Sequence, residues 1–433
     1  MSTNSRNKFI LGAVVLLVMG LFVGNWVYGN SVAKKMDRQL QLKLANANLP
    51  VSFTYEDLTV NPLFSKVKLQ AVAVTDPKSQ TTLTCEGLDI DIPYDDALEL
   101  AQSNKFEELK AFKLMMDNVA VKASAGQGEV SFGDVVIDFD GYLTKADIEQ
   151  MDEVFPEEDQ HLTLSFSDMK VQAAEIYRAY GFTPEQADQF STIDKALFSF
   201  AFRPGKNKLE IEEVSVSSPI LAYQMSAQVD YSGTGLEHFR ANNVDVAYDC
   251  GMVPSSLEWG NPSQTGRFSL ANLKASFDGS VSYNKEKGFA PNMGDSEFSF
   301  LLEGLKAEFT GRKKAELEAQ AALLGIGLDE LRVDKFAFNS SVADNRLTIK
   351  DTELETSLLK AYLSADVQMD SQNPDNSVIN EAKLVIKDLT PELDARIGDL
   401  EIMFNKKIPR EGSDIVLEIT GSINKPVIKG LAF

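Results

Sequence analysis

One long alternation of apolar and polar residues, which occurs twice, most limits what this chain can fold into. Apolar side chains stand at every second position in two segments of the chain: Leu221, Tyr223, Met225, Ala227, Val229 and Tyr231, and then Leu359, Ala361, Leu363, Ala365, Val367 and Met369. Six alternate positions need a strand of about 11 residues, about 37 Å long, which exceeds the usual strand length. The period of two predicts sheets with one apolar face and one polar face.

The two alternating segments belong to a longer internal repeat. The sequence "FSFAFRPGKNKLEIEEVSVSS" (198–218) matches "FAFNSSVADNRLTIKDTELET" (336–356) in the positions of its apolar residues. The alternation slips after Ile211, and it slips again after Ile349. A slip of one residue turns the following side chains to the other face, so we expect a β-bulge at the same point of both copies.

The repeat and the turn signals divide the chain into segments. We expect an N-terminal β region at 51–150, a first β repeat with a helix at 160–295, and a second β repeat with a helix and a terminal capping strand at 296–433. The helices are expected at about 172–195 and 311–330, the second with an apolar stripe of Ala315, Ala319, Ala322 and Leu323. The fold class is therefore mainly β with a few helices (α+β): an elongated, curved antiparallel sheet built of repeats.

The chain closes on "VLEITGSINKPVIKGLAF" (416–433), which predicts a strand and a turn at Gly421-Ser422. Pro426 lacks the N–H group that a central strand needs, so it indicates a sheet edge. We expect Leu431 and Phe433 to pack against the end of the sheet as a terminal cap.

The N-terminus contains a run of 20 largely apolar residues, Phe9–Tyr28, preceded by Arg6 and Lys8. This length suits a membrane-spanning helix, so we expect a short tail and transmembrane anchor at 1–30 and a linker helix at 31–50. The positive N-terminus places the rest of the chain outside the cytoplasm. Ser31-Val32-Ala33 resembles a weak cleavage site, which leaves open whether the anchor is retained.

Composition excludes several functional classes. Acidic residues outnumber basic ones by 64 to 42, so binding to nucleic acid is not expected. His161 and His238 are the only histidines, and no catalytic or nucleotide-binding motif is present, so we expect neither an enzyme nor a cofactor. Asp89 and Asp91 alternate with isoleucines, which indicates the solvated face of a strand rather than a calcium site.

The two cysteines, Cys85 and Cys250, leave open whether they form one disulfide, because the sequence does not show their separation.

The long alternating strands are compatible with two arrangements of their apolar side. Either helices or the folded sheet close it into an ordinary core, or it stays partly open as a trough that holds acyl chains. The side chains expected to line such a groove are Leu221, Tyr223, Met225, Val229, Leu359, Leu363 and Val367.

These features resemble a known family. The segments "LTVNPLFSKVKLQAVAVTDP" (58–77), "KLEIEEVSVSSPILAYQMSAQVDYSG" (208–233) and "VLEITGSINKPVIKG" (416–430) look like the AsmA-like proteins of Gram-negative envelopes and their smaller relative, the type II secretion N-protein. A rival resemblance is to the YdgA-like group, through "GNWVYGNSVAKKMD" (24–37).

The AsmA-like resemblance implies a single-pass inner-membrane protein with its bulk in the periplasm, acting in outer-membrane biogenesis. It implies phospholipid as a partner, held or passed in an apolar β-groove. The alternative is a scaffold or assembly factor of the cell envelope or secretion machinery that handles no lipid.

Overall fold

The computed structural model describes residues 29–431 except 39, 43–51, 62–65, 92–107, 123–127, 173–176, 178–181, 254–255, 261–265, 285–287, 324–330 and 371–372. The predicted anchor at 9–28 and the last residue, Phe433, lie outside the described residues. Strands account for 64% of the structure, far above the 20–25% typical of globular domains. The expectation of a mainly β, antiparallel protein with few helices is therefore confirmed.

The chain forms two compact units. The first consists of Met1–Gln172, Ile193–Asn207 and Gly233–Phe239. The second consists of Ala173–Thr192, Lys208–Ser232 and Arg240–Phe433. These boundaries follow contacts in space, whereas the predicted segments at 51–150, 160–295 and 296–433 follow sequence similarity and stay a prediction.

The sheet of the first unit is built around β3, which pairs with β1, β2 and β4; the run then continues through β6, β7 and β9 to β10. Short β5 and β8 pair beside it, and α3 and two 3-10 turns complete the unit. The bounds are β1 Ser52–Thr54, β2 Asp57–Asn61, β3 Lys66–Asp76, β4 Thr81–Asp91, β5 Glu108–Leu109, β6 Phe112–Lys122, β7 Glu129–Asp140, β8 Leu143–Thr144, α3 Lys145–Gln150, β9 Gln160–Val171, β10 Thr192–Arg203, η3 Pro204–Lys206 and η4 Leu236–His238.

A helix over 29–38 and 40–42 packs on the apolar face of this first sheet. Ala33 joins a core cluster with buried strand residues, namely Leu58, Val67, Leu69, Val72, Cys85 and Val119. The Tyr55 hydroxyl donates a 2.6 Å hydrogen bond to Asp37 Oδ1 on the helix. The described part of the predicted linker, 31–50, is thus packed against the sheet.

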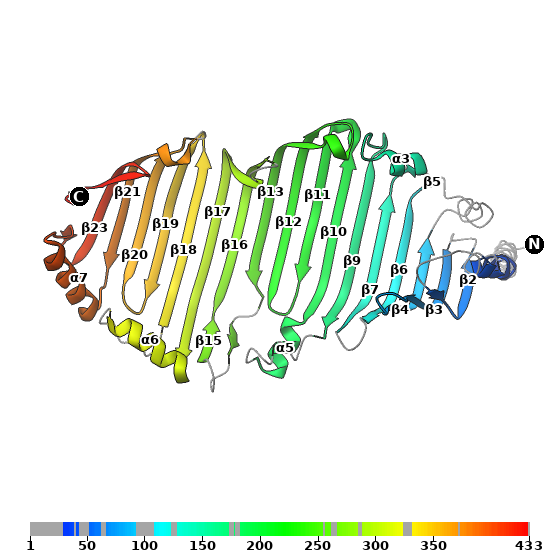
Figure 1. The fold of residues 1–433 in the computed structure, drawn as a ribbon, viewed down its shortest axis with the longest axis horizontal. Coiled ribbons are helices and arrows are strands. Elements are labelled where there is room, and N and C mark those ends of the chain that lie inside the picture. Colours follow the sequence, from blue (N-terminus) through cyan, green and yellow to red (C-terminus); the bar gives the residue numbers. More distant parts are fainter. Residues whose placement is uncertain are drawn as a thin grey trace, which may run out of the picture. The chain divides into compact units, whose positions relative to one another are not determined.

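The sheet of the second unit runs in chain order from β11 to β24, and each strand is antiparallel to the next (Figure 1). Its main strands are β11 Lys208–Ser217, β12 Leu221–Ser232, β13 Arg240–Met252, β16 Asn272–Asn284, β17 Gly288–Phe309, β18 Leu331–Ala343, β19 Arg346–Thr356, β20 Lys360–Gln368, β21 Val378–Lys387, β23 Asp414–Ser422 and β24 Lys425–Ile428. Short strands pair beside it: β14 Leu257–Trp259, β15 Gly266–Leu270 and β22 Arg410–Glu411.

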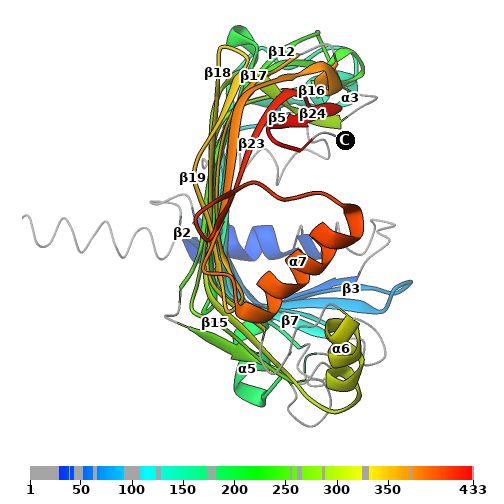
Figure 2. The ribbon, with the colours of Figure 1, turned by 90° about the vertical axis from the view of Figure 1, so that its left-hand side faces the viewer.

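The helices of the second unit are α5 (Pro184–Phe190), α6 (Gly311–Leu323), α7 (Pro391–Phe404) and the 3-10 turn η5 (Pro374–Asn376). Figure 2 shows α6 and α7 on the same side of the unit's sheet. Thr183 and Thr390 cap α5 and α7, each followed by a proline in the first turn. These caps are a helix-start signal.

Two helix expectations need correction, and one helix was missed. Of the helix predicted at 172–195, residues 173–176 and 178–181 lie outside the described residues; Tyr177 is helical, Thr183 caps α5, and β10 already begins at Thr192, so the predicted end at 195 is wrong. In α6, Ala315 and Ala319 are exposed, whereas Ala321 is buried, so the predicted alanine stripe is wrong in phase. The helix α7 was not expected, although Thr390-Pro391 marks its start.

The repeat is confirmed in its hydrogen bonds. Register shifts occur between Ile211 and Val214 and between Ile349 and Thr352, so both copies carry the predicted bulge at the same position. The loops before these strands both contain an asparagine in the left-handed region, Asn207 (φ 55°) and Asn345 (φ 58°). Asparagine tolerates this conformation better than most residues do.

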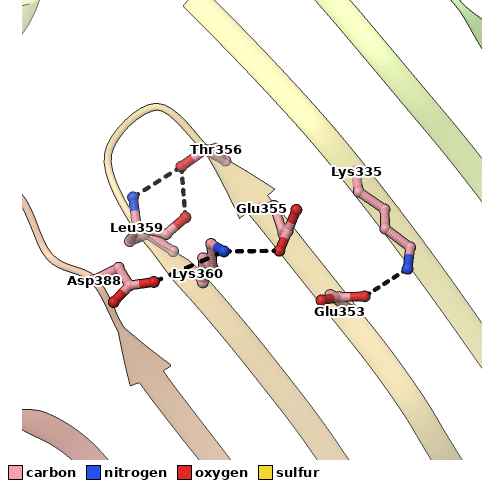
Figure 3. Close-up of polar contacts among 7 residues, drawn as sticks. All are labelled: Lys335, Glu353, Glu355, Thr356, Leu359, Lys360 and Asp388. Carbon is pink, nitrogen blue, oxygen red and sulfur yellow. Dashed lines mark hydrogen bonds and ion pairs between the residues drawn. The ribbon is translucent and has the colours of Figure 1, made fainter.

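The next turn also recurs. Ser218 Oγ accepts hydrogen bonds from the Ile220 and Leu221 N–H groups and donates to the Leu221 carbonyl. Thr356 Oγ1 makes the same three bonds to Leu358 and Leu359, and Figure 3 shows the two to Leu359. The hydroxyl therefore fixes the turn that starts the long alternating strand in each copy.

The C-terminus ends in a hairpin. β23 and β24 pair from Ser422↔Lys425, so the turn lies at Ile423-Asn424 rather than at the predicted Gly421-Ser422. Pro426 lies in the short β24, and Leu431 forms a bridge to Ile428. A short strand with a proline is one way to blunt a sheet edge.

We expect Tyr55→Phe to destabilise the first unit by about 1 kcal/mol, because it removes one hydrogen bond. Burial and the bond to Asp37 raise the pKa of Tyr55 from 10.0 to about 12. The neutral hydroxyl therefore stabilises the folded state below pH 10, and this contribution is lost as the pH rises toward 12. Absorbance at 295 nm checks this: the difference between wild type and Y55F should titrate near pH 12. Titration near pH 10 contradicts it.

We expect Thr356→Val and Ser218→Ala each to lower the free energy of unfolding of the second unit by about 1 kcal/mol, because two turn N–H groups lose their acceptor. Urea unfolding followed by circular dichroism measures the change. Thr348→Val, elsewhere on β19, is a matched control that leaves the turn intact. If the control costs as much as T356V, the turn has no special role.

Candidate functional site

The cross-strand registers of the second unit bring its apolar side chains onto one surface. Met225 lies opposite Tyr248, Tyr248 opposite Phe277, and Phe277 opposite Phe298. Residues directly opposite each other project from the same side of a sheet. We call this surface the apolar face. It comprises Leu221, Tyr223, Met225, Ala227 and Val229 of β12; Val244, Val246, Tyr248 and Cys250 of β13; Leu273, Ala275 and Phe277 of β16; Phe298, Phe300 and Leu302 of β17; Phe336 and Phe338 of β18; Leu347, Ile349 and Leu354 of β19; Ala361, Leu363, Ala365 and Val367 of β20; Ala382, Leu384 and Ile386 of β21; and Ile415, Leu417 and Ile419 of β23.

Six of the seven side chains expected to line a groove belong to the apolar face. Leu221, Tyr223, Met225 and Val229 lie in phase on β12, and Leu363 and Val367 lie in phase on β20. Leu359 precedes β20 and accepts a hydrogen bond from the Thr356 N–H group in the turn. The two sets are separated in the sheet by five strands, so they mark two parts of one surface rather than one compact pocket.

Aromatic rings form the centre of the apolar face, and this cluster was not predicted. Tyr248 stacks between Tyr223 (centroids 6.5 Å apart) and Phe277 (5.9 Å). Phe298 and Phe338 lie 5.9 Å apart, and Phe300 and Phe336 5.8 Å. Apolar and polar residues also alternate at 244–252 and 298–302. A search of every strand for this period of two would therefore have found the aromatic cluster.

Most of the apolar face is half-buried. Tyr223, Met225, Phe277, Phe298 and Leu363 all keep part of their surface in water. Full burial is reached at Val244, Val367, Ala382 and Ile415. A sheet whose inner face is covered by a second layer buries most of these positions. The apolar face is therefore only partly covered by the protein itself.

The opposite side of the same strands is polar. It is formed by Gln224, Ser226, Asp249, Ser276, Asp278, Glu297, Ser299, Asn339, Ser341, Thr348 and Lys350. An open hollow of about 750 Å³ is lined mostly by these residues and also by Met225, Tyr248, Phe277 and Phe298. Of the seven residues expected to line an apolar groove, Met225 is the one that borders this hollow.

Ion pairs cross the strands on this polar side (Figure 3). Lys335 Nζ lies 2.7 Å from Glu353, and Lys360 Nζ lies 3.2 Å from Glu355 and 3.8 Å from Asp388. The hydrogen bond from Lys335 lowers the pKa of Glu353 and raises that of Lys335. Charged groups keep this side wetted and distinguish it from the apolar face.

The two cysteines are free, so the disulfide left open by the sequence is not formed. Cys85 is buried in the core cluster of the first unit, and Cys250 lies on the apolar face of the second. Burial raises the pKa of both thiols, with a smaller contribution from Asp117 at Cys85 and from Asp249 at Cys250. The reactivity of the Cys250 thiol therefore depends on what covers the neighbouring side chains of Tyr223 and Tyr248.

His161 lies on β9 of the first unit, where its Nε2 is 3.1 Å from Ser199 Oγ. Sequence reasoning did not anticipate this contact. His238 ends the short turn η4. Within the part of the chain that the structure describes, no group of three or more His, Cys, Asp or Glu side chains is placed to hold a metal ion.

Comparisons with known proteins bring no relative. No protein-family model, curated protein or solved structure matches the chain. The helices among the described residues are all too short or too polar to cross a membrane.

We expect Cys250 to react with iodoacetamide more slowly than a free cysteine at pH 8.5, because its raised pKa lowers the thiolate fraction. Mass spectrometry of the alkylated peptide measures the rate, and the same peptide in urea is the control. Equal rates in the folded and unfolded chain would show that the apolar face leaves Cys250 fully open.

Proposed function

We propose that this chain holds or passes phospholipid on the apolar face of its second unit, as a non-enzymatic, membrane-anchored protein of the cell envelope. The observation that carries the proposal is the partial burial of a continuous apolar surface that spans β12 to β23. Apolar ligand sites combine such a surface with polar groups at their margin.

The energetics favour an apolar ligand. Full burial of a large apolar side chain contributes roughly 1.5–3 kcal/mol, so a Phe or Leu that keeps up to a third of its surface in water forgoes up to about a third of that. The loss recurs at Tyr223, Phe277, Phe298 and Leu363. An acyl chain laid along these side chains would remove their remaining surface from water without needing directional contacts.

The sequence supports the proposed location of the chain. The apolar run Phe9–Tyr28 favours a single-pass inner-membrane anchor with the two units in the periplasm. An elongated, curved sheet beside a bilayer would give lipid a continuous apolar surface. The resemblance to AsmA-like proteins supports the same function, and the YdgA-like resemblance shares the anchor and the β repeats.

A second candidate is a scaffold or assembly factor of the envelope or secretion machinery. It is favoured by the four fully buried members of the apolar face, Val244, Val367, Ala382 and Ile415, since a closed core buries such residues. On this view the half-buried members are covered by a protein partner rather than by lipid.

Lipid analysis of two neighbouring substitutions tests the proposal. Met225→Glu places a charge on the apolar face, whereas Ser226→Glu places the same charge on the exposed polar side of the same strand. We expect wild type and S226E, purified in mild detergent, to carry phospholipid that exceeds the detergent background, and M225E to lose most of it.

Leu363→Glu and Ser364→Glu repeat the comparison on β20, where Ser364 is exposed. Circular dichroism of each variant shows whether the sheet remains folded. Lipid-free wild type, or equal lipid content in M225E and S226E, contradicts the proposal; crosslinked envelope proteins on lipid-free chain favour the scaffold.

A further inference from the structure

The last turn of α7 exposes large apolar side chains. Ile402 is 81% exposed, Met403 65%, Phe404 65% and Leu400 48%. Isolated exposed hydrophobic residues are ordinary, but four within five consecutive residues form a patch that water disfavours. The patch belongs to none of the strands that form the apolar face.

The exposed turn continues an apolar stripe along the helix. Leu393, Ile397, Leu400 and Phe404 recur at spacings of three and four residues, which places them along one side of α7. Leu393 and Ile397 are half-buried, while Leu400 and Phe404 are exposed. The stripe therefore begins in contact with the protein and ends in solvent.

The turn is held in place rather than frayed. Asp394 forms a 2.8 Å ion pair with Arg410, and Glu401 accepts a 2.8 Å hydrogen bond from the Ile408 N–H group. The N–H group of Asn405, in the left-handed region at φ 50°, donates to the Glu401 and Ile402 carbonyls. These contacts fix the chain on the far side of the turn, so the apolar side chains are presented outward by a capped helix.

A pair of lysines follows the apolar turn. Lys406 and Lys407 come after Asn405, and the Lys407 side chain is exposed. Apolar side chains bordered by lysines match the interface of an anionic bilayer, where acyl chains lie beneath negative headgroups.

We propose that the last turn of α7, residues 400–404, inserts into the interface of a phospholipid bilayer, with Lys406 and Lys407 at the headgroups. Ile402 lies on a different side of the helix from Leu400 and Phe404, so the turn is apolar on every side except that of Glu401, whose carboxylate accepts the hydrogen bond from the Ile408 N–H group. A helix that binds a protein groove needs a stripe on one side, whereas lipid surrounds an inserted turn. This contact goes beyond the proposed lipid-holding function and does not depend on it.

A fluorescent probe on the full chain tests the insertion. Met403→Cys, in a C250A background, is labelled with the polarity-sensitive dye NBD, and the chain is reconstituted into vesicles of phosphatidylglycerol and phosphatidylcholine. The matched control carries the dye at Lys425→Cys, an exposed position on β24. We expect the emission at 403 to shift to shorter wavelength and to be quenched by doxyl-labelled lipid, and the emission at 425 to do neither.

Charge reversal tests the role of the lysines. We expect K407E to raise the fraction of phosphatidylglycerol that gives half of the maximal shift at 403, and K425E to leave it unchanged. A water-like emission at 403 in all vesicles, or equal shifts at 403 and 425, overturns the proposal. A shift that appears only when envelope proteins are added also overturns it, in favour of a protein partner. Since the readout is at α7, its failure leaves the lipid content of the apolar face as a separate result.

Discussion

The structure depends on one constraint: in an antiparallel ladder, each residue faces the side opposite to its neighbour in sequence. Most pairings between β11 and β23 place apolar residues opposite apolar residues, with exceptions such as Phe298 opposite Ser340, and the bulges at 211–214 and 349–352 restore the phase where the sequence slips. Without the first bulge, a slip of one residue would place Met225 opposite a glutamate of β11 instead of Val214. The apolar face exists because the register holds over many strands.

The two sides of such a sheet differ sharply in polarity. One side carries carboxylates, amides and ion pairs such as Lys335–Glu353, and the other carries stacked aromatic rings such as Tyr248 and Phe277. A sandwich solves the imbalance with a second sheet, and an α/β protein solves it with helices. In the first unit a helix over residues 29–38 and 40–42 covers buried strand residues such as Val67 and Val119. In the second unit the aromatic centre remains half-buried, and the proposed apolar ligand would cover it.

Features that depend on local periodicity could be predicted from the sequence. Features that depend on contacts between distant segments could not. The strands, the repeat and the shared bulge follow from alternation, and the structure confirms them. The end of the helix expected at 172–195 and the phase of α6 were wrong, because the start of β10 and burial, rather than alanine content, decide them. The hollow over Asp249 and Glu297 was missed, since a period of two shows which residues share a side but not how that side curves. The Ser199–His161 contact joins residues 38 positions apart on strands whose register no local pattern indicates.

Photocrosslinking in living cells tests the central claim most directly. A benzophenone amino acid at position 298 stands on the apolar face, and the same group at position 297 stands on the exposed polar side of the same strand. If the second unit carries phospholipid, irradiation of cells grown with radioactive phosphate should label the protein at 298 and not at 297. Absence of lipid adducts at 298, or equal labelling at both positions, would contradict the account.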